Sequence, residues 1–454
     1  MIEEKTLKQI EKLNNEYHQF NTLCHVQNKH ENKSGKLKKY AISVKDAICV
    51  KDINSSAGGA MLKEYKPLFH ATVVEKLLAE GAIIIGKTAQ DANGFGSFSV
   101  NVGEGLSIPL HPLDKTRSCG GSSGGAAGFT KLAEINQISH IALGESTGGS
   151  IAAPASFCGV YGLTPTYGLV SRYGLMDYAN SLDKIGPIAS STKEIALCLS
   201  IIAGYDEKDS TSVNVKIPDY ELSLHKPVKG MKIGIINECF GEGVDKEIAV
   251  CVMSAIDLLK KQGAIIEEVS LPTVTKYALE TYYLLAMCEA STNLAKYCGI
   301  RYGAHEKLEG NFNEYFSKVR DKYFNKEEKR RILIGTFARM AGYRDAYYIK
   351  AAQVRTLIIA EYKNIFKKFD LLVCPAMSIT APTFKEIEKL TPLQNYMMDI
   401  MTVGPNLAGL PHISCPTGEN KKKMPIGTMF IADHFQEEKL LQVASALEKN
   451  IPKK

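Results

Sequence analysis

The sequence predicts an α/β protein with a mixed sheet and an added helical region around residues 273–369. Apolar, strand-like blocks alternate with amphipathic helical patterns near both ends of the chain. Between residues 273 and 369 the apolar spacing is mostly helical instead. No internal repeat is visible, and no linker rich in Pro, Gly and Ser separates two halves. We therefore expect residues 1–454 to form a single domain.

The first third of the chain supplies alternating elements. Its N-terminal segment predicts an amphipathic helix, with leucine and isoleucine side chains on one face. Residues 41–48, AISVKDAI, predict a strand that runs into a loop. Residues 70–81 predict a helix that ends at a glycine, and AIIIG directly after it predicts a buried strand. HIAL, at 140–143, predicts another strand inside a tract dense in Gly, Ser and Ala.

The rest of the chain shows the same two patterns, apolar residues at helical spacing and short strand-like apolar blocks. Helices are predicted at 192–206, 246–262 and 437–450, and strands at 231–237, 370–376, 412–416 and 425–431. Three long helical patterns fill the stretch between 273 and 369. Strands thus occur on both sides of the helical region, as expected if it is an addition to one sheet.

Composition and charge narrow the class of protein. The chain has 454 residues, 45% of them hydrophobic, and a formal net charge of +6, which is weak evidence for an anionic partner. Its eleven cysteines follow no C-x-x-C or disulfide pattern, which favours reduced thiols and a cytoplasmic location. The N-terminus lacks the apolar core of a signal peptide, and no apolar run is long enough to predict a membrane span.

GAIIIGKT, at 81–88, matches the pattern G-x-x-x-x-G-K-[ST] of phosphate-binding loops. Such a loop turns its backbone N–H groups toward an anion at the start of a helix. Here three consecutive isoleucines stand between the glycines, and β-branched side chains favour an extended strand. The strand also precedes the Gly-Lys-Thr, whereas it should precede the first glycine. We therefore predict a core strand that ends in a loop, with no ATP site at Lys87.

GGSSGG matches the G-x-S-x-G nucleophile elbow of α/β-hydrolases, through Ser122 and Ser123. A triad of that kind needs an acid and then a histidine farther along the chain. His412 and His434 come late enough, but neither stands in a recognisable catalytic loop. A Ser-His-Asp triad therefore remains an alternative.

Another serine, Ser150, ends the segment TGGS. Consecutive small residues allow a tight turn whose N–H groups converge beside the hydroxyl, and each such donor stabilises an oxyanion by ~3 kcal/mol. A serine nucleophile also needs a base, and a lysine serves where burial keeps it neutral. Lys45, which has apolar neighbours, is a candidate. The alternative interpretation is that Lys45 lies on the surface at the end of a strand and has no catalytic role.

The tract GGSSGGAAG…GESTGGSIAAPASFCGVYGLTPTYGLVSRYG, with AISVKDAI upstream, resembles the amidase signature family, and the match covers most of the chain. Within that family, SRYGLMDYANSLDKIGPIA, EASTNLAKYCGIRYG, KRRILIGTFARMAGYRDAYYIKAAQVR and GPNLAGLPHISCP resemble the A subunits of glutamyl-tRNA(Gln)/aspartyl-tRNA(Asn) amidotransferases. The resemblance implies the amidase-signature fold, in which helices cover both faces of a mixed β-sheet.

The resemblance also implies a Ser–cis-Ser–Lys triad. Ser150 takes the position of the nucleophile, and Lys45 that of the base. Ser122 takes the position of the bridging serine, which follows a cis peptide bond. The backbone N–H groups of Thr147, Gly148 and Gly149, with that of Ser150, form the implied oxyanion hole.

The family's glutamine-binding positions fall on Ser97, Tyr282, Arg331 and Asp399, with Thr147 again. Free glutamine carries an α-carboxylate and an α-ammonium group. We therefore expect Arg331 to pair with the carboxylate and Asp399 with the ammonium.

Four differences from the family pattern stand near these positions. Ser146 replaces the usual Asp before TGGS, and Ala152 replaces the usual Arg two residues after Ser150. Losing one member of a buried pair costs ~3–5 kcal/mol, whereas replacing both is nearly neutral, so we expect the loss of a support and not of catalysis. A few extra residues separate SSGG from TGGS. TAQDANGFGSFS, around Ser97, replaces the usual Asn-Met-Asp-Glu-Phe run.

The implied activity is that of a glutaminase that supplies ammonia within a tRNA-dependent amidotransferase. The ammonia converts misacylated Glu-tRNA(Gln) or Asp-tRNA(Asn) to the amidated form. The B and C subunits of such an enzyme are the implied partners in a heterotrimer. ATP, Mg²⁺ and most of the tRNA contacts belong to the partner, so this chain is expected to need no cofactor or metal. The alternative is a stand-alone amidase acting on small amides.

Overall fold

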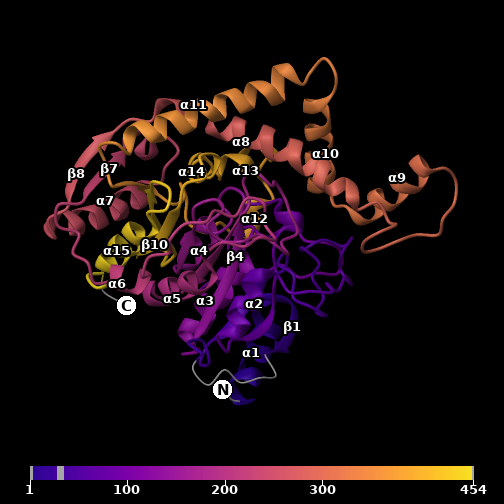
Figure 1. Ribbon diagram of the computed structural model, residues 1–454, viewed down its shortest axis with the longest axis horizontal. Coiled ribbons are helices and arrows are strands. Elements are labelled where there is room, and N and C mark those ends of the chain that lie inside the picture. The colour runs from indigo at the N-terminus through magenta and orange to yellow at the C-terminus, as the bar shows by residue number, and fades with distance from the viewer. Residues whose placement is uncertain (1–3, 28–34, 452–454) are drawn as a thin grey trace.

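The computed structural model describes residues 4–27 and 35–451 (Figure 1). Within these residues, 11 strands form one sheet in the order β1-β3-β2-β4-β6-β5-β10-β11-β9-β7-β8. Toward one edge, β2 pairs in parallel with β3 and β4, and β1 is added antiparallel to β3. At the other edge, β7 pairs in parallel with β8 and β9. The pairs between these two groups are antiparallel. The mixed sheet is as predicted. The strands are β1 Phe20–Val26, β2 Ala41–Lys45, β3 Ile83–Thr88, β4 His140–Ser146, β5 Tyr161–Thr164, β6 Lys184–Ala189, β7 Lys232–Ile236, β8 Ile265–Val269, β9 Leu371–Pro375, β10 His412–Glu419 and β11 Pro425–Ala432.

Helices cover both faces of this sheet, as the resemblance implies. In β4, Ile141 and Leu143 belong to a core that side chains of α2 and α5 share, whereas Ala142 between them packs with Ala126 of α3 and Ala155 of α4. The longer helices are α1 Glu4–Tyr17, α2 Thr72–Ala79, α3 Gly124–Ile135, α4 Ala152–Cys158, α5 Thr192–Ile202, α7 Lys246–Lys261, α8 Pro272–Asn293, α9 Phe312–Tyr323, α10 Lys326–Arg339, α11 Lys350–Ile365 and α15 Glu437–Glu448. The shorter ones are α6 Tyr220–Ser223, α12 Phe384–Ile387, α13 Pro392–Met397, α14 Val403–Leu407 and the π-helix η4 Asp345–Ile349.

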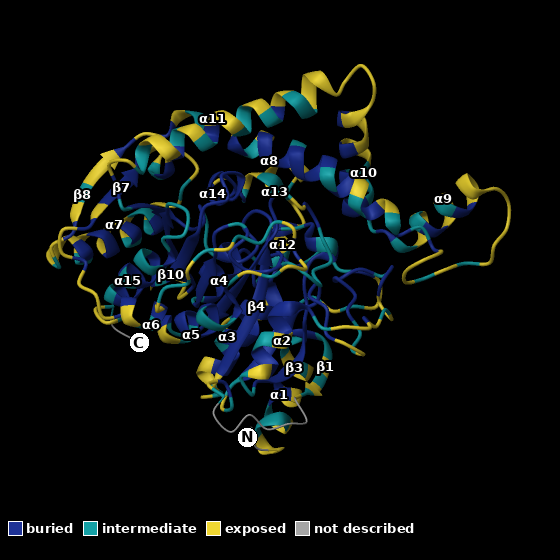
Figure 2. Ribbon diagram, in the orientation of Figure 1, coloured by how far each residue is buried: buried dark blue, intermediate teal, exposed yellow. Residues whose placement is uncertain are grey.

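The predicted helical region is formed by α8 to α11. Figure 1 shows α11 lying along α8, with α9 projecting at the end of an arm beyond α10. Much of this arm and of the turn between α10 and α11 is exposed in Figure 2, whereas β4 and the helices around it are buried. The region therefore forms one wall of the molecule beside the strands that carry the serine segments.

The phosphate-loop pattern lies in β3, which continues through the Gly-Lys-Thr and so extends farther than predicted. Gly86 allows the close pairing with β1, because a Cβ there would lie 2.6 Å from Cδ1 of Phe20. Lys87 is fully buried, and its Nζ donates to the Asp46 carbonyl at 3.1 Å and to Oγ of Ser55 at 2.7 Å. These contacts keep the strand extended and make Lys87 part of the core.

Candidate active site

Two residues of the predicted triad are in contact at the carboxyl ends of β2 and β4. Lys45 is the last residue of β2, and its Nζ lies 2.7 Å from Oγ of Ser122. Both side chains are buried. The peptide bond between Gly121 and Ser122 is cis, in the place that the resemblance implies. Gly121 fits there because a Cβ would lie 2.3 Å from Oδ2 of Asp91.

Lys45 has a further partner that the sequence reasoning missed. Its Nζ also donates to the main-chain carbonyl of Glu145 at 2.9 Å and to Oε2 of the same residue at 2.8 Å. Glu145 lies near the end of β4, which runs parallel to β2 and beside it. Parallel neighbours end at the same edge of a sheet, which explains the contact, but the sequence does not show that these two strands are neighbours.

The carboxylate of Glu145 leads to a second buried acid, Asp183. Oγ1 of Thr147 lies 2.9 Å from Oε1 of Glu145 and 2.7 Å from Oδ1 of Asp183. Asp183 also accepts the backbone N–H groups of Tyr178 and Ala179. Burial raises the pKa of Asp183 well above its usual range, and the charge of Glu145 adds to the shift. The strand β6 brings Asp183 here, since its Ile185 pairs with Glu145 in β4.

The TGGS segment forms the turn between β4 and α4. Oγ of Ser146 donates to the Gly148 carbonyl at 2.9 Å, and the Asn406 amide donates to the same oxygen. The Ser150 carbonyl accepts the backbone N–H of Ser123 at 3.2 Å, so the two serine segments touch. The turn thus places Thr147, Gly148 and Gly149 beside Ser150, whose exposed fraction is 8%.

The predicted glutamine-binding residues lie against this turn. A Cβ on Gly148 would lie 2.8 Å from the Tyr282 hydroxyl, and one on Gly149 would lie 3.1 Å from Oδ1 of Asp399. Oγ of Ser97 lies 3.2 Å from the same Oδ1. The structure therefore brings Ser97, Tyr282 and Asp399 together at the TGGS glycines.

Asp399 has a perturbed carboxyl group. Burial raises its pKa to about 6, against the opposing effects of the Tyr283 hydroxyl and the Arg331 charge. The Tyr283 hydroxyl donates to Oδ2 of Asp399 at 2.6 Å. No sequence pattern indicated Tyr283.

Arg331, on α10, lies in a cage of aromatic rings. Its guanidinium carbon is 5.1 Å from the ring centroid of Phe95, 5.4 Å from those of Tyr283 and Tyr396, and 5.7 Å from that of Tyr178. This arrangement stabilises a buried cation through the negative faces of the rings.

Two hydrogen bonds fix the plane of the Arg331 guanidinium. Nη1 donates to the Tyr178 hydroxyl at 2.7 Å, and Nε donates to Oε1 of Glu327 at 2.8 Å. Tyr178 and Glu327 are further residues that the sequence reasoning did not single out, because nothing in their spacing marks them.

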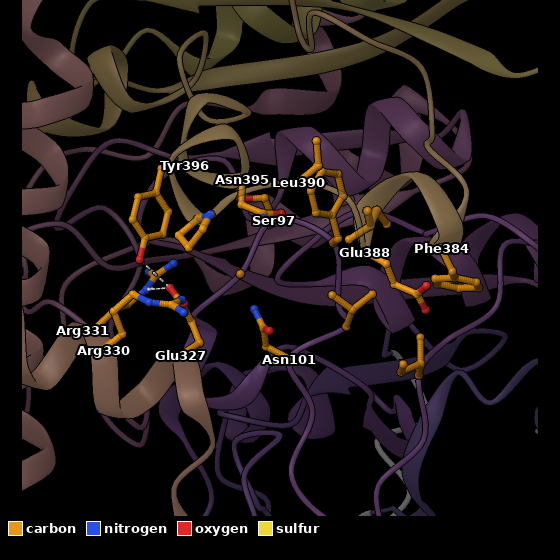
Figure 3. Close-up of a pocket in the computed structure, with 16 residues that line it drawn as sticks. Ser97, Asn101, Glu327, Arg330, Arg331, Phe384, Glu388, Leu390, Asn395 and Tyr396 are labelled. Atoms are coloured by element: carbon orange, nitrogen blue, oxygen red, sulfur yellow. Dashed lines mark hydrogen bonds and ion pairs between the residues drawn. The ribbon is translucent and has the colours of Figure 1, made fainter.

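Ser97 and Arg331 both face a cavity of about 530 Å³ (Figure 3). Its wall also includes Phe384, Leu390 and Tyr396. From this cavity a continuous set of contacts runs through Ser97 and Asp399 to the TGGS turn. The arrangement suits a small substrate with charged groups at one end and a reacting group at the other.

The histidines of the alternative hydrolase triad have other partners. Nδ1 of His412, in β10, lies 3.4 Å from the Leu410 carbonyl, and Nε2 of His434 lies 3.0 Å from the Ala408 carbonyl. Ser122 is in contact with Lys45 instead. The geometry therefore favours lysine over histidine as the base.

Two further findings concern the described part of the chain alone. Across residues 4–27 and 35–451, no three His, Cys, Asp or Glu side chains are grouped so that they could hold a metal ion. In the same residues, every helix is too short or too polar to cross a membrane.

The chain is similar to known proteins of one family. The Amidase family model matches residues 4–441. The A subunit of the glutamyl-tRNA(Gln) amidotransferase from Koribacter versatilis is 47% identical over 409 residues, which cover 90% of this chain and 83% of that protein. The crystal structure of the corresponding Thermotoga maritima protein superposes with a TM-score of 0.83 at 35% identity, covering 98% of this chain and 90% of that one. A peptide amidase from Stenotrophomonas maltophilia has a TM-score of 0.73 at 25% identity, covering 92% and 84%. This chain therefore belongs to the amidase family.

Proposed function

We propose that this chain is the glutaminase component of a tRNA-dependent amidotransferase. The observation that carries the proposal is the 2.7 Å contact between Lys45 and Ser122, whose cis peptide bond stands next to the TGGS turn. The similarity to the A subunits of glutamyl-tRNA(Gln) amidotransferases supports the choice of glutamine as substrate. We also propose that the whole chain acts as one amidase domain, since one sheet contains strands from both of its ends.

In the proposed reaction, the neutral amine of Lys45 accepts the hydroxyl proton of Ser122, which in turn accepts that of Ser150. The Ser150 oxygen attacks the side-chain carbonyl carbon of glutamine. The backbone N–H groups of Thr147, Gly148 and Gly149 stabilise the oxyanion. The proton then returns through Ser122 to the departing nitrogen, ammonia leaves, and water hydrolyses the acyl-enzyme to glutamate.

Substrate selection is assigned to the residues around the cavity. Arg331 pairs with the α-carboxylate of glutamine, and Asp399 with its α-ammonium group. Ser97, Tyr282 and Thr147 line the path between these two charges and the nucleophile. The support for this assignment is the set of contacts that joins Ser97 and Asp399 to the glycines of TGGS.

The proposal includes partner chains, the B and C subunits of the amidotransferase, with ATP, Mg²⁺ and most of the misacylated tRNA bound to the B subunit. Exposed apolar side chains at the end of α10 and in the turn after it support a protein partner. Leu333, Phe337, Met340 and Tyr343 expose 70%, 41%, 51% and 44% of their surfaces. A cytoplasmic location is also proposed, and all eleven cysteines are free, which agrees with it.

The test uses Ser150→Ala in the chain co-expressed with the B and C subunits. Glutamine-dependent amidation of misacylated tRNA should be lost, while ammonia still supports amidation, because the partner site is untouched. Ser156→Ala is the matched control, since Ser156 is a buried serine on α4 whose Oγ accepts the Gly427 N–H. Equal loss with both nitrogen donors would refute the assignment. Hydrolysis of other small amides by the chain without its partners would instead favour a stand-alone amidase.

A further inference from the structure

Lys45 has three oxygen atoms around its nitrogen. The distances from Nζ are 2.7 Å to the Ser122 hydroxyl, 2.9 Å to the Glu145 carbonyl and 2.8 Å to Oε2 of Glu145. A neutral lysine amine has two hydrogens and one lone pair. If Glu145 accepts both hydrogens, the lone pair is left for the Ser122 hydroxyl. The geometry therefore fits an amine that is ready to take a proton from Ser122.

The other carboxyl oxygen of Glu145, Oε1, also has a hydrogen-bond partner. Oε1 lies 2.9 Å from Oγ1 of Thr147, which is also 2.7 Å from Oδ1 of Asp183. A hydroxyl has one hydrogen, so it donates to one carboxyl group and accepts from the other. Asp183 is the group whose pKa is raised, by its burial and by the charge of Glu145. Thr147 therefore links the two acids, and Glu145 is the one that pairs with Lys45.

Asp91 is a further acid on which the charge of Lys45 acts. Asp91 accepts the backbone N–H groups of Ser99 and Asn101, and burial raises its pKa. The charge of Arg331 also acts on Asp91, and Arg331 itself pairs with Glu327. The Glu145 carboxylate is the charged group in direct contact with Lys45.

We propose that Glu145 is a positioning residue for the base: its carboxylate aims the Lys45 lone pair at Ser122 and stabilises the ammonium ion that forms as Ser150 attacks. The inference rests on the proposed function. In a Ser-His-Asp triad, a buried carboxylate orients the imidazole and stabilises the imidazolium in the same way. Here the base is a lysine, and the acid is supplied by the strand that leads into the nucleophile turn.

The protons balance along this chain of groups. One proton moves from Ser150 to Ser122 while the Ser122 proton moves to Lys45, which becomes an ammonium ion beside the Glu145 carboxylate. As the C–N bond of the tetrahedral intermediate breaks, a proton returns from Lys45 through Ser122 to the departing nitrogen. Glu145 stays ionised throughout. A neighbouring negative charge stabilises the protonated form of an amine, so the charge at position 145 bears on the pH at which the enzyme becomes active.

The experiment compares Glu145→Gln and Glu145→Asp in the full chain co-expressed with the proposed B and C subunits, with glutamine as the probe. Glu145→Gln keeps the shape and removes the charge. We expect kcat to fall about 10- to 100-fold, the range for one charge-assisted hydrogen bond, with KM changed little. The ascending limb of the pH–rate profile should move to lower pH. Glu145→Asp, which keeps the charge, should retain the position of the limb and recover part of kcat.

Several outcomes would overturn the inference. Wild-type kcat and pH profile in Glu145→Gln would do so, as would a Glu145→Asp enzyme no better than Glu145→Gln. If Glu145→Gln does not fold, a folded Glu145→Asp with activity as low as Lys45→Ala would have the same effect. Glu361→Gln is the matched control, because Glu361 is a remote carboxylate that accepts two backbone N–H groups at the start of α8. Absence of Ser150-dependent glutaminase in the wild type would instead contradict the proposed function.

Discussion

Replacing Lys45 with Met removes the nitrogen that pairs with the buried Glu145 carboxylate and leaves that carboxylate without this partner. The two side chains are 0% and 4% exposed. Breaking a buried pair from one side costs ~3–5 kcal/mol, because the remaining charge stays desolvated. At about 2.1 cal/mol/K per residue, a chain of this length has an unfolding entropy of roughly 1 kcal/mol/K. Lys45→Met should therefore lower Tm by about 3–5 °C.

The double variant Lys45→Met/Glu145→Gln is the informative comparison. It replaces both charged groups with neutral side chains of similar size, and such replacements are often close to neutral. We expect it to recover most of the lost Tm, although both variants lack glutaminase activity. Stability and catalysis are then separated in one series.

Thermal unfolding followed by circular dichroism measures these shifts. Lys439→Met is the control, because the Lys439–Asp370 pair is partly exposed, with 31% and 35% of its side chains accessible. An exposed pair contributes ~0–1 kcal/mol, so this control should change Tm by at most about 1 °C. A double variant less stable than Lys45→Met would refute the reasoning, since the carboxylate would then be stabilising without its lysine.

Two further predictions concern the substrate charges. Arg331→Lys keeps the charge but loses the planar fork, so KM for glutamine should rise about 10- to 100-fold in steady-state assays. Arg330→Lys, next in the chain and 38% exposed, should leave KM nearly unchanged, and equal effects would contradict the carboxylate role of Arg331. Because the pKa of Asp399 is raised to about 6 by burial, KM should rise as pH falls below that value and the carboxylate is protonated. Asp399→Asn should raise KM at every pH and abolish this dependence, whereas an unchanged KM would exclude Asp399 from ammonium binding.

Periodicity predicted the elements that have one buried face. The helix α1 buries Ile10 and Leu13, and β3 is a run of buried isoleucines, so both carried a clear pattern. The helices α3 and α4 carried none, although they flank the active site. Every residue of α4 is buried, and a helix buried on all sides has no polar face to reveal its period.

The glycines of α3 explain why its tract appeared unusual rather than helical. A Cβ on Gly125 would lie 2.3 Å from the Gln19 carbonyl oxygen, and one on Gly128 would lie 2.2 Å from Oε1 of Gln19. Small residues are needed there for close contact with the segment before β1. Their low helix propensity hides the helix from a propensity argument, because tertiary contacts decide the conformation.

Motif spacing located single residues of the site but not the contacts between them. Lys45 and Ser122 stand far apart in sequence. Their own motifs made them candidates, and the resemblance assigned their roles. Glu145, Tyr178 and Tyr283 were missed because their roles depend on which strands and helices are neighbours. The pairing of β2 with β4, for example, is what brings Glu145 to Lys45. A strand order was not predictable from the sequence, so neither was this contact.

The structure explains why Ser146 and Ala152 can replace the usual residues of the family pattern. Ser146 forms a neutral hydrogen bond to the Gly148 carbonyl, and Ala152 is fully buried in an apolar cluster that includes Tyr178. Neither Ser146 nor Ala152 leaves a buried charge without a partner. Replacing both members of a charged pair is tolerated on that condition. Successive residues of a strand point to opposite faces, so a carboxylate at 145 faces Lys45, whereas the side chain at 146 turns toward the nucleophile turn. The chain thus has an acid at the end of β4, and this acid contacts the base.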